Sequence, residues 1–286
     1  MKTNILAILR SPRFSPNSEE KDRLIMKALT DNLSAEGHAI TTINEEDIQA
    51  CYDIINTDNC RAAPCLHADI ILNMGRKPTV LKLLKEEEAS GTIVINSPKS
   101  IEACNRRQID MLMRQNGMPV APENGKEGWW IKRCDETAQT ANDIRYAANE
   151  QEKVATLMAL KQRNITDVLV TAHVPGDLIK FYGIADSDFF ATFYPTDDCN
   201  YKFQNEKING KARHYIYNEQ EMRDCAEKIA HIIGISFYGG DCIVKRDGSF
   251  VFIDFNDWPS FSRCREAASQ TMAQQIKQII NRLYRV

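Results

Sequence analysis

Asp241, Asp254 and Asn256 are the residues of this chain whose types and spacing best support chemistry. They lie on two apolar stretches that flank Asp247-Gly248, a pair typical of a β-hairpin with a two-residue type I′ turn. In that hairpin Asp241 and Asp254 face each other, and period-two alternation places Asn256 on the same face as Asp254. Opposed like charges destabilise a sheet. Three converging oxygen-bearing side chains therefore predict a Mg²⁺ site, which could also take Mn²⁺.

The register of this hairpin is predicted residue by residue. A two-residue turn pairs Arg246 with Ser249 and Val244 with Val251. The alternative to a metal site is that both carboxylates extend into solvent at the mouth of an exposed hairpin. We favour the metal site because the flanking strands are more apolar than an exposed ribbon would be.

Composition limits the classes of function. The chain has 286 residues, enough for two or three lobes, and its net charge of −3 does not indicate a nucleic-acid surface. No apolar run approaches membrane-spanning length, and the opening MKTNILAILR predicts a first strand and not a signal peptide. Nine cysteines, an odd number, favour a reducing, cytoplasmic location. Cys60, Cys65 and His67 match no zinc spacing, so we expect no metal there.

The first third of the chain alternates strand and helix patterns, which predicts βαβ units and a mostly parallel sheet. The expected strands and helices, in chain order, are 4–9, 18–36, 38–43, 69–74, 79–89 and 92–95. Glycines at 37 and 91 follow the two helical patterns, as C-terminal caps do.

The remainder predicts a mixture of antiparallel strands and helices. We expect helical pieces within 98–116, strands at 129–133, 167–173, 177–184 and 189–194, and helices at 149–163, 218–233 and 263–284. The polar, glycine-containing segment from Thr196 to Arg213 is predicted to be a mobile loop that could act as a lid.

Three basic residues precede the acidic pair in the chain: Arg106, Lys132 and Lys180. Lys132 and Lys180 lie within apolar strands, where an unpaired ammonium group is costly. A single strand lysine usually faces solvent, but three cations together with a carboxylate-held metal are what a nucleotide triphosphate requires.

The order of these motifs resembles that of the ATP-grasp superfamily, and within it carboxylate-amine ligases such as glutathione synthetase and the ligases that add glutamate to a ribosomal protein. The resemblance covers nearly the whole chain and rests on four stretches: INSPKSIEACNRRQIDMLMRQNGMPVAP, WWIKR, DVLVTAHVPGDLIKFYGI and GGDCIVKRDGSFVFIDFNDWP. It implies an α/β (α+β) ATP-grasp fold. The expected parts are a parallel-sheet pre-ATP-grasp domain at 1–97 and an ATP-grasp domain at 98–286, whose small (98–173) and metal-binding (174–286) subdomains sandwich the nucleotide.

The resemblance also implies roles for particular residues. Arg106, Lys132 and Lys180 would contact the phosphates, and Asp241, Asp254 and Asn256 would hold Mg²⁺. The hinge strand at Thr171, Ala172 and His173 would hold adenine through its backbone. Asp177 is either a ribose partner or an exposed turn residue, and Ile243 packs either on adenine or in the core. This chain departs from the family in having Asp254 where glutamate is more frequent, and CDETAQTANDIRY where a glycine-rich lid is common.

We expect the substrates other than ATP to bind where the first strands end, because open α/β sheets bind ligands at the carboxyl ends of their strands. Basic and hydroxyl side chains there, and after the metal segment, are suited to carboxylate or phosphate. A solvated loop arginine or an ordinary helix cap is the alternative for each of them. These candidates are Arg10, Ser11, Arg13, Arg76, Ser260, Ser262 and Arg263.

The leading hypothesis is an ATP- and Mg²⁺-dependent ligase that joins a small carboxylate, such as an amino acid or peptide, to an amine or thiol through an acyl phosphate. Its partners would be ATP and these small molecules, with no nucleic acid and no membrane. A homodimer is one option, because related ligases are usually dimers, and the sequence leaves the oligomeric state open. Two alternatives stay open. One is a kinase that phosphorylates a small-molecule hydroxyl, and the other is a nucleotide-binding regulator without turnover.

Overall fold

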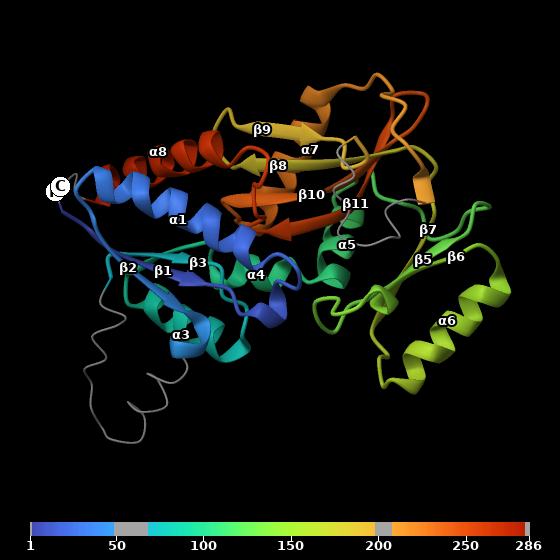
Figure 1. The fold of residues 1–286 in the computed structure, drawn as a ribbon, viewed down its shortest axis with the longest axis horizontal. Coiled ribbons are helices and arrows are strands. Elements are labelled where there is room, and N and C mark those ends of the chain that lie inside the picture. The colour runs from blue at the N-terminus through green and yellow to red at the C-terminus, as the bar shows by residue number, and fades with distance from the viewer. Residues whose placement is uncertain (1, 49–67, 198–207, 284–286) are drawn as a thin grey trace.

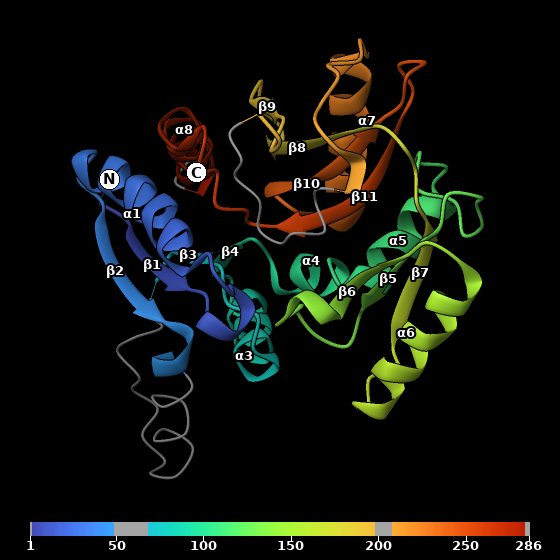
Figure 2. The same ribbon diagram turned by 45° about the vertical axis from the view of Figure 1, so that its right-hand side comes forward.

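The computed structural model describes residues 2–48, 68–197 and 208–283, which form three sheets with their covering helices (Figures 1 and 2). The described residues do not include Cys60, Cys65 and His67, at which we expected no metal site. None of the helices in the described part of the chain combines the length and apolar character that a membrane span requires.

The N-terminal sheet is parallel, as predicted, with strand order β2-β1-β3-β4. Alternate residues of β1 enter different cores: Ile5 packs toward α1 and α8, and Leu6 packs toward α3. The chain thus buries both faces of its first strand, which accounts for the apolar run there. The elements are β1 (Asn4–Leu9), η1 (Pro12–Phe14), α1 (Glu19–Ala35), β2 (Ala39–Asn44), β3 (Ile70–Asn73), α3 (Pro78–Ala89) and β4 (Ile93–Ile95).

The other two sheets are antiparallel. The small sheet has order β6-β5-β7 and is covered by α6, and the central sheet has order β11-β10-β8-β9. The elements are α4 (Pro98–Ala103), α5 (Arg106–Gln115), β5 (Trp129–Arg133), η2 (Ala141–Asp143), β6 (Ile144–Ala147), α6 (Glu150–Gln162), β7 (Val168–Ala172), β8 (Asp177–Ile184), β9 (Phe190–Phe193), α7 (Glu219–Ile233), β10 (Phe237–Val244), β11 (Phe250–Asp257) and α8 (Arg265–Leu283).

The hydrophobic cores do not follow chain order. Ile109 and Met113 of α5 share a core with α7 and the central sheet, although they lie in the segment predicted as the small subdomain. Met272 and Ile276 of α8 pack with α1 on the N-terminal sheet, and Figure 1 shows these two helices side by side. The predicted domain boundaries remain a prediction, and the packing joins segments across them.

The hairpin of β10 and β11 differs from its predicted register by one residue at the loop. Lys245 donates to Ser249 O at 2.8 Å, and Gly248, at φ +82°, donates to Lys245 O at 3.0 Å. This is a three-residue loop whose glycine occupies the left-handed region, not a two-residue turn. Val244 therefore pairs with Phe250.

A bulge restores the predicted acidic pair. The register shifts between Asp241 and Cys242, so that Cys242 pairs with Phe252 and Asp241 pairs with Asp254. The extra residue is Ile253, and an extra residue of this kind reverses the alternation of the strand beyond it. The opposition of the two aspartates is confirmed, although the predicted turn was wrong.

The end of β11 is tied to the N-terminal sheet by a buried carboxylate. Asp257 accepts hydrogen bonds from Arg10 Nη2 at 3.2 Å and from Arg76 Nε at 3.2 Å. Burial disfavours the ionised form of Asp257, but the guanidinium groups of Arg76 and Arg10 outweigh this effect and hold its pKa below the ordinary value. Arg10 also pairs with Asp22 of α1.

We expect Asp257→Asn to lower the free energy of unfolding at pH 7 by about 3–5 kcal/mol, because the guanidinium groups of Arg10 and Arg76 lose the buried anion that they share. Since the folded pKa of Asp257 is depressed, its stabilisation is present above about pH 4 and is lost as pH falls through the folded pKa. The difference in free energy of unfolding between the variant and the wild type should therefore become smaller in acid. Urea unfolding at several pH values measures this difference.

Asp31→Asn is the matched control, because Asp31 forms an exposed ion pair with Lys27 of the same helix. Its loss should change the free energy of unfolding by no more than about 0.5 kcal/mol. Equal effects of the two substitutions would contradict the role assigned to Asp257.

Candidate functional site

Two cavities meet at the acidic pair. A cavity of about 110 Å³ lies between the small and central sheets, and a cleft of about 700 Å³ extends from it toward the N-terminal sheet. Both are lined by Arg106, Ile144, Asp241 and Asp254. The cleft is of the size that small-molecule sites commonly have. The acidic pair therefore stands where an apolar pocket opens into a polar cleft.

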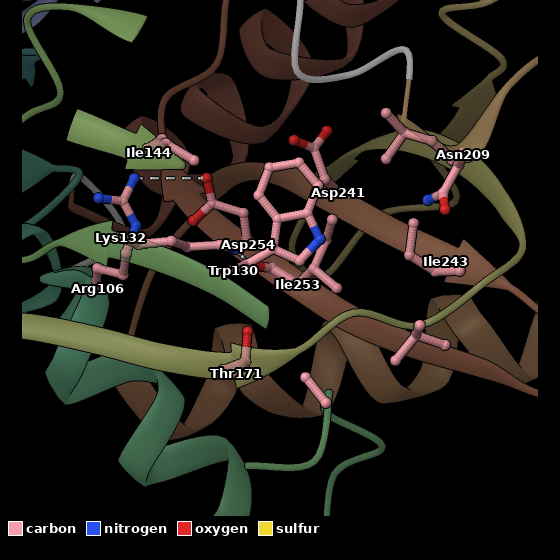
Figure 3. A pocket seen from close by; sticks show the side chains of 13 residues that line it. Arg106, Trp130, Lys132, Ile144, Thr171, Asn209, Asp241, Ile243, Ile253 and Asp254 are labelled. Atoms are coloured by element: carbon pink, nitrogen blue, oxygen red, sulfur yellow. Dashed lines mark hydrogen bonds and ion pairs between the residues drawn. The ribbon is translucent and has the colours of Figure 1, made fainter. Parts of the chain in front are cut away.

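Cations from neighbouring elements offset the two carboxylates. Lys180 Nζ lies 3.1 Å from Asp241 Oδ1, across the β8–β10 pair. Arg106 Nη2 lies 4.0 Å from Asp254 Oδ2, as the dashed line in Figure 3 shows. Burial would raise the pKa of Asp254, but Arg106, Lys132 and a hydrogen bond with Asn256 lower it below its ordinary value. Asp254 is therefore held as a carboxylate.

Lys132 extends from β5 to β11 and connects the two sheets. Its Nζ donates to Ile253 O at 2.6 Å, the carbonyl of the bulge residue. Burial lowers the pKa of Lys132, and the nearby Asp254 partly counteracts that shift. Lys132 therefore points into the protein and not into solvent, although a single lysine in an apolar strand usually faces solvent.

Arg106 is the first residue of α5, which begins there because Asn105 caps it and accepts hydrogen bonds from the amides of Arg107 and Gln108. Its Nη1 donates to Arg133 O at 2.5 Å. Its Nε is buried and has no hydrogen-bond partner among the residues that the structure describes.

Side chains from both sheets, most of them apolar, line the rest of the small cavity. The predicted residues Thr171, Ala172 and Ile243 are among the lining residues. The hinge backbone is partly occupied, because the amides of Ala172 and His173 donate to Pro122 O and Gly128 O. His173 does not line the cavity; its Nδ1 lies 3.1 Å from Trp130 Nε1, and burial lowers its pKa.

Sequence reasoning missed several lining residues. Trp130 was not among the predicted site residues, yet it borders the cavity beside Lys132 (Figure 3). Ile144 begins the short strand β6, which was not predicted because its four residues include an arginine and carry no clear alternation. The alternation Trp129-Trp130-Ile131-Lys132 could have indicated that Trp130 and Lys132 share a face.

Comparison with known proteins gives a result at the level of the fold. No protein-family model matches the chain, and no curated protein matches its sequence. The structure is similar to D-alanine–D-alanine ligase from Bacillus anthracis complexed with ATP, with a TM-score of 0.62 and 12% identity over 98% of this chain and 96% of that chain. This chain has the ATP-grasp fold. The predicted resemblance is confirmed at that level.

Other ATP-grasp structures agree. VanG D-Ala:D-Ser ligase from Enterococcus faecalis has a TM-score of 0.60 and 13% identity over 92% of each chain. The ATP-grasp ligase PsnB, complexed with a minimal precursor, has a TM-score of 0.57 and 14% identity over 96% of this chain and 100% of that chain.

The donor set at the acidic pair fits a divalent cation. Asp241, Asp254 and Asn256 all line the cleft, and they offer two carboxylates and an amide oxygen from two paired strands. Hard cations such as Mg²⁺ prefer oxygen ligands of this kind. Their metal-binding role stays a prediction, which the opposed carboxylates support.

The acceptor candidates divide into two groups. Arg10, Arg76, Ser260, Ser262 and Arg263 line the cleft. Arg10 and Arg76 are bound to Asp257, so a protein carboxylate takes the position expected for a substrate carboxylate.

Two candidates lie away from the cleft lining. The amide of Ser11 donates to Glu45 Oε1 at 2.5 Å, and Arg13 pairs with Glu136.

Asp177 was expected at a ribose or in an exposed turn. It is 3% exposed, and its two carboxylate oxygens accept the amides of Arg213 and Tyr215.

The predicted lid, 196–213, lies partly outside the described residues. At its beginning Thr196 Oγ1 accepts the amide of Ala212. In the segment 134–146, Asp143 accepts the amides of Gln139 and Thr140 and pairs with Arg163.

Asp254→Asn should weaken Mn²⁺ binding by more than about tenfold, because the affinity of oxygen sites depends on the number of charged ligands. Electron paramagnetic resonance of free Mn²⁺ measures this. Asp247→Asn is the matched control, since Asp247 bonds to Ser249 in the loop at the opposite end of the same hairpin. Equal affinity in the two variants would place the metal elsewhere.

Proposed function

We propose that the protein is an ATP- and Mg²⁺-dependent ligase that joins a small carboxylate, such as an amino acid or a peptide, to an amine or thiol. The carboxylate attacks the γ-phosphoryl group of ATP, and ADP leaves. The amine or thiol then attacks the acyl carbon of the acyl phosphate and displaces inorganic phosphate.

The observation that carries this proposal is the meeting of the two cavities at the charged cluster. An apolar cavity suits a nucleobase, and a polar cleft of about 700 Å³ on the other side of the carboxylates suits the acceptors. The phosphoryl group would then be transferred where the cavities join. The similar ATP-grasp structures, a D-alanine–D-alanine ligase and PsnB, are themselves named as ligases.

The cations of the chain would perform the electrostatic work. Arg106 comes from α5, Lys132 from β5 of the small sheet, and Lys180 from β8 of the central sheet. When a triphosphate is bound, these three cations would interact with the phosphate oxygens as well as with the carboxylates. Charge that moves toward the leaving group is then stabilised without a protein nucleophile. Mg²⁺ on Asp241, Asp254 and Asn256 would supply further positive charge at the phosphates.

Hydroxylamine trapping tests the proposal. The protein is incubated with Mg²⁺-ATP, hydroxylamine and a panel of amino acids, peptides and other small carboxylic acids. We expect ADP and a hydroxamate to form together with at least one acid, because hydroxylamine captures an acyl phosphate. Mass spectrometry identifies the hydroxamate, and Asp254→Asn should reduce both products to background.

Two outcomes would contradict a ligase. A stable phosphorylated product without hydroxamate would indicate a kinase. ATP binding without ADP release across the whole panel would indicate a regulator.

A further inference from the structure

Asn209 lies in the apolar cavity at the end away from Arg106 and Asp254, close to Ile243 (Figure 3). Its Oδ1 is buried and accepts no hydrogen bond from any residue that the structure describes. An unsatisfied buried polar atom is destabilising, and native proteins contain few of them. This oxygen is therefore suited to a donor that a bound molecule brings.

The opposite end of the cavity has the complementary feature. Arg106 Nε is a buried donor, also without a partner among the described residues, and it stands beside the acidic pair. The cavity thus presents a donor at its ionic end and an acceptor at its apolar end. ATP is complementary to this arrangement, because its phosphate oxygens accept hydrogen bonds and the exocyclic amino group of its base donates them.

Among the cavity residues, Asn209 Oδ1 is an acceptor that no donor of the described residues occupies, so it can meet an amino group on a base. The amides of Ala172 and His173 donate to protein carbonyls and are therefore not free to donate to the ring nitrogens of a base, which makes a contact to the exocyclic amino group the means of selection. The apolar lining residues Val174, Leu178 and Ile243 provide contact area, but they cannot distinguish one purine from another through hydrogen bonds.

We propose that Asn209 Oδ1 accepts a hydrogen bond from the exocyclic amino group of adenine and makes Asn209 a base-selecting residue. The inference rests on the proposed binding of ATP. A nucleotide whose phosphates lie against Arg106 and Lys132 directs its base toward the apolar end, where Asn209 and Ile243 lie.

The test compares ATP with purine riboside triphosphate, in which hydrogen replaces the exocyclic amino group. Calorimetric titration with Mg²⁺, and without an acceptor, gives both dissociation constants. We expect the wild type to bind ATP about 3- to 10-fold more tightly than the deamino nucleotide, the range of one neutral hydrogen bond. Asn209→Ala should remove this preference by weakening ATP binding alone. Asn209→Asp should retain it, because a carboxylate also accepts.

Ile208→Ala is the matched control, since Ile208 is the exposed neighbour of Asn209 and should leave the wild-type ratio unchanged. A wild-type ratio that persists in Asn209→Ala would overturn the proposal. Loss of the preference in Asn209→Asp would show that an acceptor at this position does not produce the preference, which also overturns the proposal. If the wild type binds neither nucleotide, the proposed function fails as well. ATP binding without a hydroxamate removes the ligase proposal and leaves the role of Asn209 intact.

Discussion

One extra residue in β11 decides how the site is built. With the three-residue loop alone, Ile253 would stand opposite Asp241, and Asp254 would point into the core that holds Phe250 and Phe252. A carboxylate in such a core is strongly unfavourable. The bulge at Ile253 reverses the alternation, so that Phe255 enters the core and Asp254 faces the cleft.

The bulge also determines which cations surround the acidic pair. The carbonyl of Ile253 accepts Lys132 Nζ from another sheet, and this bond brings β5 over β11. Arg106 approaches Asp254 from α5, and Lys180 approaches Asp241 from β8. The repulsion between two opposed carboxylates is therefore relieved by three separate elements. The same arrangement holds the charges that phosphoryl transfer would require.

Strand β11 continues beyond the acidic pair to fix the N-terminal sheet. Asp257 binds Arg10 and Arg76, and Trp258 and Phe261 then enter the core beneath α1 and α8. Arginines at the carboxyl ends of parallel strands were expected to meet a substrate. Here the two arginines connect the N-terminal sheet to the strand that carries the acidic pair. These contacts hold the two sides of the cleft together.

The positions of most elements, and the pairing of Asp241 with Asp254, could be predicted from sequence. Helices such as α1 and α7 are specified by local signals: apolar periodicity, the Asn218 cap that accepts the amide of Glu221, and glycines in the left-handed region at their ends. Four-residue β6 was missed because a short strand carries too little local pattern. The loop register was missed because Asp-Gly is compatible with more than one loop length.

The sequence by itself determined the order of the basic and acidic residues and the apolar character of the strands around them, since these are properties of local composition. Only the tertiary structure decided that Ile253 is extra, that Trp130 and Asn209 line the cavity, and that Arg10 and Arg76 bind Asp257. The physical reason is that register and cavity lining depend on packing between segments far apart in the chain. A shift of one residue there reverses which side chains face the site.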